Sequence, residues 1–189
     1  MSNIYAEANI PTGSNNYLKL SKQAETTFRI MDDPIMGTEG WKTAPDGTRR
    51  PVRVPQGEAI SVNDIDNVEE LKYFWAMIVF DYAEERIKIL EVTQPSVLKA
   101  IKAYARDKDF GDPKEYDFKV TKTGDGKESR YQTIAKPPKK LDSAITQLYR
   151  DMDINLQALF NGSDPFFKVD EQAKEDKLVD EVSNALKDN

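Results

Sequence analysis

Alternating apolar and polar positions predict strands along much of the chain. The stretches "YLKL" at 17–20 and "ETTFRIM" at 25–31 read as strand, and the second is rich in Thr, Phe and Ile with a period of two. The stretch "KYFWAMIVFDY" at 72–82 is apolar or aromatic on both faces, which predicts a strand in the centre of a sheet. After the turn "AEER", the alternating residues 86–93 complete a long hairpin with it.

The spacing of apolar residues changes to a helical period after this hairpin. It predicts a helix over 95–107, with Pro95 suited to the first turn. A second hairpin then follows, with strands over 115–124 and 129–135 on either side of the turn "GDGK".

Weaker patterns mark both ends of the chain and a long stretch between the first strands. Residues 1–16 are polar, and we expect a mobile lead-in there. Residues 32–71 form a long insertion with little strand or helix signal, and loops of this length are usually functional or disordered. Short helices are predicted over 141–163, and the alternating charges of 164–189 predict an exposed acidic helix or tail.

The order of these elements favours a mainly β fold with some helix. It runs strand, insertion, strand, strand, helix, strand, strand, which is the order of a five-stranded OB-fold barrel. The barrel core is expected over 17–140, with the long insertion 32–71 after its first strand and the short helices 141–163 packed on the core. An α+β sandwich made of the same elements is the alternative.

Composition narrows the chemistry that the chain can perform. The 189 residues include no Cys and no His, 32% are charged, and the net charge is −6. Ser-His-Asp and Cys-His catalysis, zinc–sulfur sites and disulfides are therefore excluded within this sequence. Its acidic clusters lack the spacing of an EF-hand, so no metal site is predicted. No catalytic residue and no cofactor are predicted either. No apolar run reaches the ~18 residues of a membrane span, and no secretory signal is expected.

One stretch, "GWKTAPDGTRRPVR" at 40–53, is basic in this acidic chain. It combines an aromatic ring with concentrated cations: Trp41, Lys42, Arg49, Arg50 and Arg53. Proteins that bind single-stranded nucleic acid need rings that stack on bases and cations that follow the phosphates. The stretch is therefore a candidate binding loop, and the alternative is a solvated loop whose Trp packs on the fold.

Both predicted hairpins add further candidates. The second hairpin carries Lys122, Lys127, Arg130 and Tyr131, next to the loop that flanks the ligand cleft in OB-folds. The first hairpin carries Lys72, Tyr73, Trp75, Arg86 and Lys88. Tyr73 and Trp75 share one face of their strand and Phe74 takes the other, but the sequence does not decide which face is core. Solubilising lysines and core aromatics are the alternative explanations.

Several strings resemble the single-stranded DNA-binding proteins of tailed bacteriophages. They are "YFWAMIVFDY", "KILEVTQPSVLKAI" and "DFGDPKEYDFKVTKTGDGKESRY", and the similarity extends over residues 17–166. The resemblance implies an OB-fold core, sequence-tolerant binding of single strands, and a role in phage replication, recombination or repair. Some members of that family carry a Cys/His zinc ribbon after the first strand, whereas 32–71 here contains neither residue type.

The leading functional hypothesis is a non-enzymatic single-stranded DNA-binding protein in the cytoplasm of a bacterial host. An OB-fold protein-interaction or architectural module is the main alternative, and a carboxylate-dependent Mg²⁺ nuclease is the weakest one. No membrane association is expected. Residues 164–189 are acidic and carry an apolar stripe, so they are candidates for autoinhibition, for recruiting replication or recombination proteins, for docking as a structural helix, or for self-association.

Overall fold

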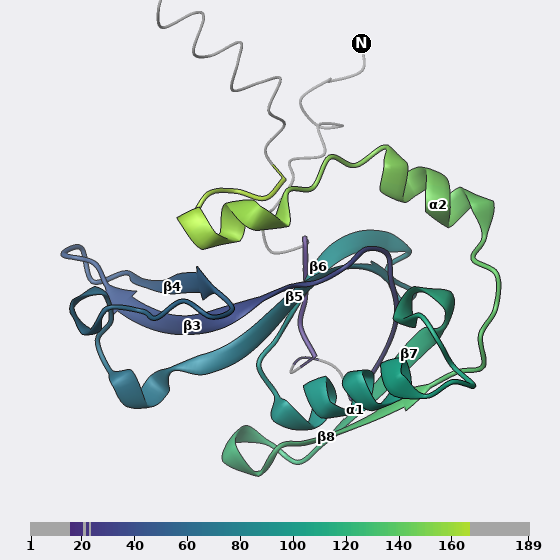
Figure 1. Ribbon diagram of the computed structural model, residues 1–189, viewed down its shortest axis with the longest axis horizontal. Coiled ribbons are helices and arrows are strands. Elements are labelled where there is room, and N and C mark those ends of the chain that lie inside the picture. Colours follow the sequence, from purple (N-terminus) through teal and green to yellow (C-terminus); the bar gives the residue numbers. More distant parts are fainter. Residues whose placement is uncertain (1–15, 21, 23, 167–189) are drawn as a thin grey trace, which may run out of the picture. The chain divides into compact units, whose positions relative to one another are not determined.

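A computed structural model describes residues 16–20, 22 and 24–166 of the chain (Figure 1). The predicted lead-in lies outside these residues except for Asn16. The acidic C-terminal helix or tail lies outside them beyond Phe166. None of the described helices has the length and apolar character that a bilayer span requires.

The described residues form a mainly β fold with few helices, as the sequence predicts. The strands are β1 (Tyr17–Leu18), β2 (Glu25–Ile30), β3 (Ile35–Thr43), β4 (Arg49–Pro55), β5 (Lys72–Asp81), β6 (Arg86–Val92), β7 (Asp117–Thr123) and β8 (Arg130–Ala135). The helices are α1 (Pro95–Arg106) and α2 (Ser143–Arg150). The 3-10 turns are η1 (Val62–Asp64), η2 (Val68–Glu70), η3 (Pro113–Glu115), η4 (Gly126–Glu128) and η5 (Leu156–Asn161).

β5 is the central strand, which confirms the prediction from its two apolar faces. It pairs with β6, and its C-terminal half pairs antiparallel with β2, while its N-terminal half pairs antiparallel with β3. The sheet is mixed, because the short strand β1 runs parallel to β6. Its order is β1-β6-β5-β2-β7-β8, with β3 and β4 attached beside β5. Among the described strands, no pairing closes this sheet into a barrel.

Contacts between residues divide the chain into two compact units. Unit 1 consists of Met1–Asp33 and Met77–Lys140, and unit 2 consists of Pro34–Ala76 and Leu141–Asn189. β5 therefore contributes its first half to unit 2 and its second half to unit 1.

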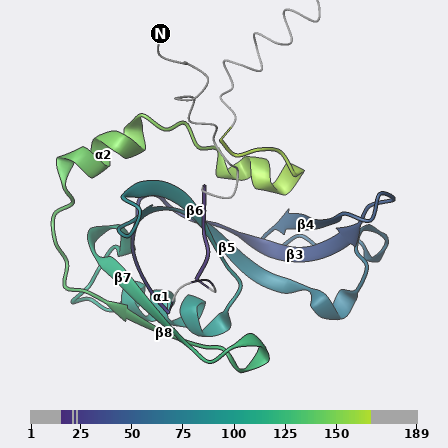
Figure 2. The ribbon, with the colours of Figure 1, turned by 180° about the vertical axis from the view of Figure 1, so that it is seen from behind.

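Unit 1 has an aromatic core between its sheet and α1. Phe28 and Phe118 are fully buried and stack with ring centroids 5.8 Å apart, and Tyr116 lies 5.1 Å from Phe118. Val97 and Ile101 of α1 are buried as well, and α1 lies against β8 in both views (Figures 1 and 2). The predicted helical period of 95–107 thus identifies the buried face of this helix.

Unit 2 contains a hairpin where the sequence suggests an irregular insertion, so that prediction is wrong. β3 and β4 pair antiparallel, with Gly37 opposite Pro55 at one end and Thr43 opposite Arg49 at the other. The turn between them contains Gly47 at φ 82°. Glycines interrupt the alternating pattern of β3 in the sequence. A Cβ at Gly37 would lie 2.1 Å from the Val54 carbonyl oxygen, so only glycine allows this close approach.

Candidate nucleic-acid interface

Within unit 2, β4, β3 and the first half of β5 form a three-stranded antiparallel ribbon. Residues directly opposite each other in such a ribbon point to the same face, and successive residues alternate. One face, here called the Tyr73 face, carries Met36, Thr38, Gly40, Lys42, Arg50, Val52, Val54, Tyr73 and Trp75. The other, here called the Phe74 face, carries Ile35, Gly37, Glu39, Trp41, Arg49, Arg53, Lys72 and Phe74.

The Phe74 face is the core side of the ribbon. Phe74 is fully buried and meets Phe160 of η5 edge-on, with ring centroids 6.1 Å apart. The guanidinium of Arg53 lies 5.5 Å from the Phe74 ring centroid, and its Nε donates a 2.7 Å hydrogen bond to Glu39. Arg53 is thus held in a structural ion pair, because both side chains are nearly buried, and the structure does not support its predicted role as a phosphate contact.

The Tyr73 face is the more exposed side, which answers the question that the sequence left open. Tyr73 is 42% exposed, and its hydroxyl donates a 3.1 Å hydrogen bond to the side chain of Gln56. Trp75 is half-buried, and its indole Nε1 is buried with no hydrogen-bond partner among the described residues. Lys42 and Arg50 occupy opposite positions on β3 and β4 at the far end of this face. They are four residues along the ribbon from Tyr73, which is about 13 Å at ~3.3 Å per residue.

Trp41 does not share a face with Tyr73 and Trp75, although the sequence groups all three as stacking candidates. It is half-buried on the Phe74 face, where the guanidinium of Arg49 lies 5.5 Å from its ring centroid. Arg49 also forms an ion pair with Glu70. A single-stranded nucleic acid that lies on one face of the ribbon can therefore contact either Trp41 or the two aromatics Tyr73 and Trp75, but not all three.

Carboxylates surround the cations at the tip of the β3–β4 hairpin. Hydrogen bonds from Thr48 hold the pKa of Asp46 below its usual value, and the hydroxyl of Thr43 does the same for the pKa of Asp66. The Lys42 ammonium donates to the carbonyl of Asn63 at 2.9 Å. Residues 56–71 contain five carboxylates and no Lys or Arg, so the basic character of 40–53 is offset locally.

In unit 1, the turn between β7 and β8 borders an open hollow of about 660 Å³. Its lining includes Thr123, Gly124, Lys127, Glu128, Ser129 and Arg130. Lys127 and Arg130 are exposed, as their predicted role requires. Lys122 and Tyr131 lie opposite each other on the core-side face of the hairpin, where Tyr131 is half-buried and Lys122 pairs with Asp125 at 3.4 Å.

The cations of the β5–β6 hairpin differ in exposure. Lys88 is only 3% exposed, and its ammonium pairs with Asp81 at 3.0 Å and with Glu84 at 2.8 Å. The structure therefore contradicts the prediction that Lys88 contacts DNA, because a buried ammonium with two carboxylate partners is not available to a phosphate. Arg86 and Lys72 are exposed at the ends of their strands.

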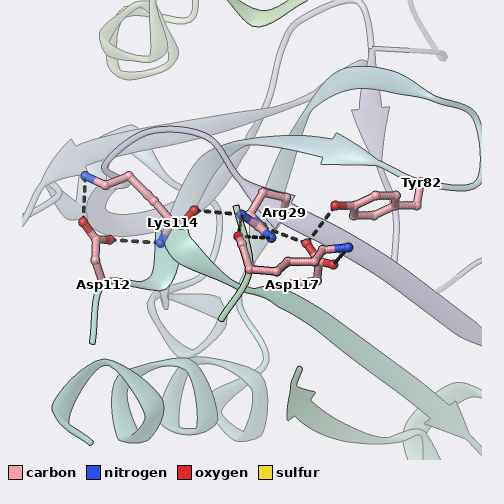
Figure 3. A network of polar contacts seen from close by, with 6 residues as sticks. Arg29, Tyr82, Asp112, Lys114 and Asp117 are labelled. Carbon is pink, nitrogen blue, oxygen red and sulfur yellow. Dashed lines mark hydrogen bonds and ion pairs between the residues drawn. The ribbon is translucent and has the colours of Figure 1, made fainter. Parts of the chain in front are cut away.

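A buried polar network in unit 1 was not found by sequence reasoning (Figure 3). Arg29 and Asp117 are both 1% exposed, and the guanidinium Nε donates to the carboxylate at 2.7 Å. Tyr82 donates a 2.8 Å hydrogen bond to the same carboxylate, and Lys139 pairs with it at 2.9 Å. The remaining guanidinium nitrogens donate to the backbone carbonyls of Lys114 and Lys139.

The pKa values of this network follow from its contacts. Burial raises the pKa of Asp117, but hydrogen bonds from Lys139, Tyr82 and Arg29 outweigh it, so the net shift is downward. Burial, reinforced by the hydrogen bond to Asp117, raises the pKa of Tyr82 to about 12. The residues of this network are not among those that line the hollow at the β7–β8 turn, and the Arg29–Asp117 pair at its centre is buried, which indicates a structural role.

Within the described part of the chain, no group of three or more acidic side chains is arranged to hold a metal ion. The candidate site therefore consists of aromatic rings and cations: the Tyr73 face in unit 2 and the β7–β8 hollow in unit 1. Comparison with known proteins adds nothing to this description, since no family model, no curated protein and no solved structure matches the chain.

Proposed function

We propose that the protein binds single-stranded DNA without catalysing a reaction, and that the Tyr73 face is the main contact surface. The observation that carries this proposal is the combination on one face of exposed Tyr73 and half-buried Trp75 with Lys42 and Arg50 further along the ribbon. Stacking rings and cations are the two components of sequence-tolerant single-strand binding. On this face they form two patches, because the side chains of Ile65 and Leu71 lie over Gly40 between them. Arg50 suits this role, because a planar guanidinium binds phosphate with two donors and also stacks on bases.

The hollow at the β7–β8 turn is a second contact region in this proposal. Lys127 and Arg130 border it, and its lining also includes the glycine and serine of the turn. The proposal counts it as a separate phosphate contact, because it belongs to the other unit of the chain.

An OB-type arrangement of unit 1 is part of the same proposal. β2, β5, β6, β7 and β8 would be the five barrel strands, with α1 between the third and the fourth. The pairs β2–β5, β5–β6, β2–β7 and β7–β8 support this assignment. A closing pair between β6 and β8 is not among the described pairings, and OB barrels are often partly open. Following the resemblance to phage proteins, the DNA would be that of a bacteriophage undergoing replication, recombination or repair in its host's cytoplasm.

Binding of another protein is the second candidate function. Val62 and Val68 are 65% and 52% exposed on the acidic segment 56–71. Exposed apolar side chains among carboxylates suit a protein partner better than a polyanion. A protein that binds through this segment would leave the Tyr73 face without a role.

Single-tryptophan variants test the proposed contact surface directly, because the chain has only two tryptophans. Trp41→Phe leaves Trp75 as the reporter on the Tyr73 face, and Trp75→Phe leaves Trp41 on the Phe74 face. We expect titration with oligo-dT to quench the emission of Trp75 strongly and that of Trp41 weakly, since a stacked base quenches an indole.

The same titration includes the controls. Duplex DNA of equal length should bind more weakly, and the affinity for oligo-dT should decrease as salt increases, because phosphate contacts release counterions. Equal affinity for duplex, or no quenching of either tryptophan, would refute DNA binding. Quenching of Trp41 alone would keep the function and move the site to the Phe74 face.

A further inference from the structure

The connection between β4 and β5, residues 56–71, crosses the Tyr73 face of unit 2. It begins beside Tyr73, whose hydroxyl donates to the side chain of Gln56. Further along, the side chain of Ile65 lies directly over Gly40, because a Cβ on that glycine would be 2.6 Å from Ile65 Cγ2. Gly40 lies between the two aromatics and the two cations of this face, so the connection, here called the strap, separates them.

The strap also occupies one of the cations that the proposed function requires. The ammonium of Lys42 donates to the carbonyl of Asn63 at 2.9 Å. The strap contains five carboxylates and no Lys or Arg, so it has the same sign of charge as a nucleic-acid backbone. One of these carboxylates, Glu70, pairs with Arg49 at the tip of the β3–β4 hairpin. A phosphate that approaches Lys42 must therefore compete with the strap.

Few contacts hold the strap against the ribbon. All of its residues are described by the structure, and among them only Ile65 is buried. The N–H of Asp66 donates to the carbonyl of Trp41 at 2.8 Å, and the hydroxyl of Thr43 donates to the Asp66 carboxylate at 2.6 Å. The regular structure of the strap consists of the two three-residue turns η1 and η2. Segments with so few buried apolar contacts open locally at a low cost in free energy.

We propose, resting on the function proposed above, that the strap is an autoinhibitory element that closes the Tyr73 face in the free protein and is displaced by single-stranded DNA. Its displacement releases Lys42 and opens the path from Tyr73 to Lys42. Leu71 stays in place, because it continues the register of β5 opposite Gly40. The closed strap lowers the apparent affinity for DNA in proportion to the fraction of molecules in which it is open.

A cross-linked variant, Gly40→Cys/Ile65→Cys, tests this by locking the strap. A Cβ at Gly40 would lie 3.6 Å from the Cβ of Ile65, within the ~3.5–4.5 Å of a disulfide. The chain has no native cysteine, so one disulfide can form, and a thiol assay verifies it. We expect the oxidised variant to bind oligo-dT about tenfold more weakly than the same variant reduced with dithiothreitol. The single variants Gly40→Cys and Ile65→Cys are the controls, and reduction should not change their affinities.

Ile65→Ala tests the strap without a cross-link. Loss of buried methyl groups weakens the closed state and leaves the aromatics and cations of the Tyr73 face in place, so the affinity for oligo-dT should rise by about tenfold. Val62→Ala is the matched control, because it shortens a side chain of the strap that is 65% exposed, and it should bind like the wild type. Circular dichroism shows whether each variant is folded.

Hydrogen exchange of the wild type observes the displacement itself. Saturating oligo-dT should speed the exchange of the Asp66 N–H, which donates to Trp41 when the strap is closed, whereas a ligand that only covers the face would slow it. Equal affinities of the oxidised and reduced double variant, or Asp66 exchange that does not accelerate, would overturn the inference and leave DNA binding standing. A wild type and variants that all fail to bind oligo-dT would refute the proposed function and the strap together.

Discussion

Asp117→Ala is expected to lower the free energy of unfolding by about 3–5 kcal/mol, the usual effect of removing one partner from a buried ion pair. The carboxylate accepts from Arg29, Tyr82 and Lys139, and the variant would leave the guanidinium of Arg29 buried without its charge partner. Only the carbonyls of Lys114 and Lys139 would remain as acceptors. Urea unfolding followed by circular dichroism measures the loss.

Asp125→Ala is the matched control for this change. It removes the same side chain from an ion pair with Lys122 in which the carboxylate is fully exposed, so the unfolding midpoint should change little. The two variants lose the same charge, so net charge cannot explain a difference between them. Similar unfolding midpoints for both would mean that the network around Arg29 does not stabilise unit 1.

The network also predicts how stability depends on pH. Asp117 has a folded-state pKa below its unfolded value, so its contribution is present above the unfolded pKa and is lost as pH falls through the folded pKa. Tyr82 has a folded-state pKa of about 12 against 10.0, so its contribution is present below pH 10 and is lost as pH rises towards 12. Tyr82→Phe should reduce the loss of stability at alkaline pH. The loss of stability at acid pH should still depend on Asp117.

Adjacent aromatics on β5 are expected to respond in opposite ways to truncation. Phe74→Ala should destabilise the fold by about 3–5 kcal/mol, because removing this fully buried ring, which contacts Phe160 and Arg53, creates a cavity. Tyr73→Ala should change stability little, because Tyr73 is 42% exposed on the other face. The proposed function predicts instead that Tyr73→Ala weakens oligo-dT binding by ~1–3 kcal/mol, the contribution of one stacked base.

Thermal unfolding and an oligo-dT titration of both variants separate packing from binding. Tyr73→Phe is the conservative control, since it keeps the stacking ring and removes only the hydroxyl that donates to Gln56. It should bind nearly as well as the wild type. A Tyr73→Ala variant that binds normally while Trp41→Ala binds poorly would place the nucleic acid on the Phe74 face instead.

The elements that follow one periodic pattern were predictable from the sequence. β5 has apolar residues on both faces, and α1 has a single apolar stripe, so each was found close to its observed bounds. The β3–β4 hairpin was missed because Gly37 and Gly40 occupy positions where a pattern of side chains would otherwise reveal a strand. Small residues that allow close packing remove the signal that sequence reasoning uses.

Candidate site residues were harder to predict, because residue type does not reveal a partner that is distant in the sequence. Lys88 and Arg53 were chosen for their charge, but Asp81 and Glu39 neutralise them in the fold. Arg29 lies between Phe28 and Ile30 in a buried strand, which already indicates a buried partner, yet Asp117 is 88 residues away. The face shared by Tyr73 and Trp75 was predictable, and its exposure required the structure.

The contacts of Arg29 also restrain the chain just before Leu141, one of the places where it passes from unit 1 to unit 2. The carbonyl of Lys139 accepts hydrogen bonds from Arg29, so the Lys139–Lys140 peptide bond is held against unit 1 although the Lys139 side chain is half exposed. Trypsin does not cleave before proline, which protects the preceding Lys136–Pro137 bond. A protease needs an extended and locally unfolded segment, so trypsin should cut slowly after Lys139 for as long as the guanidinium keeps its acceptors.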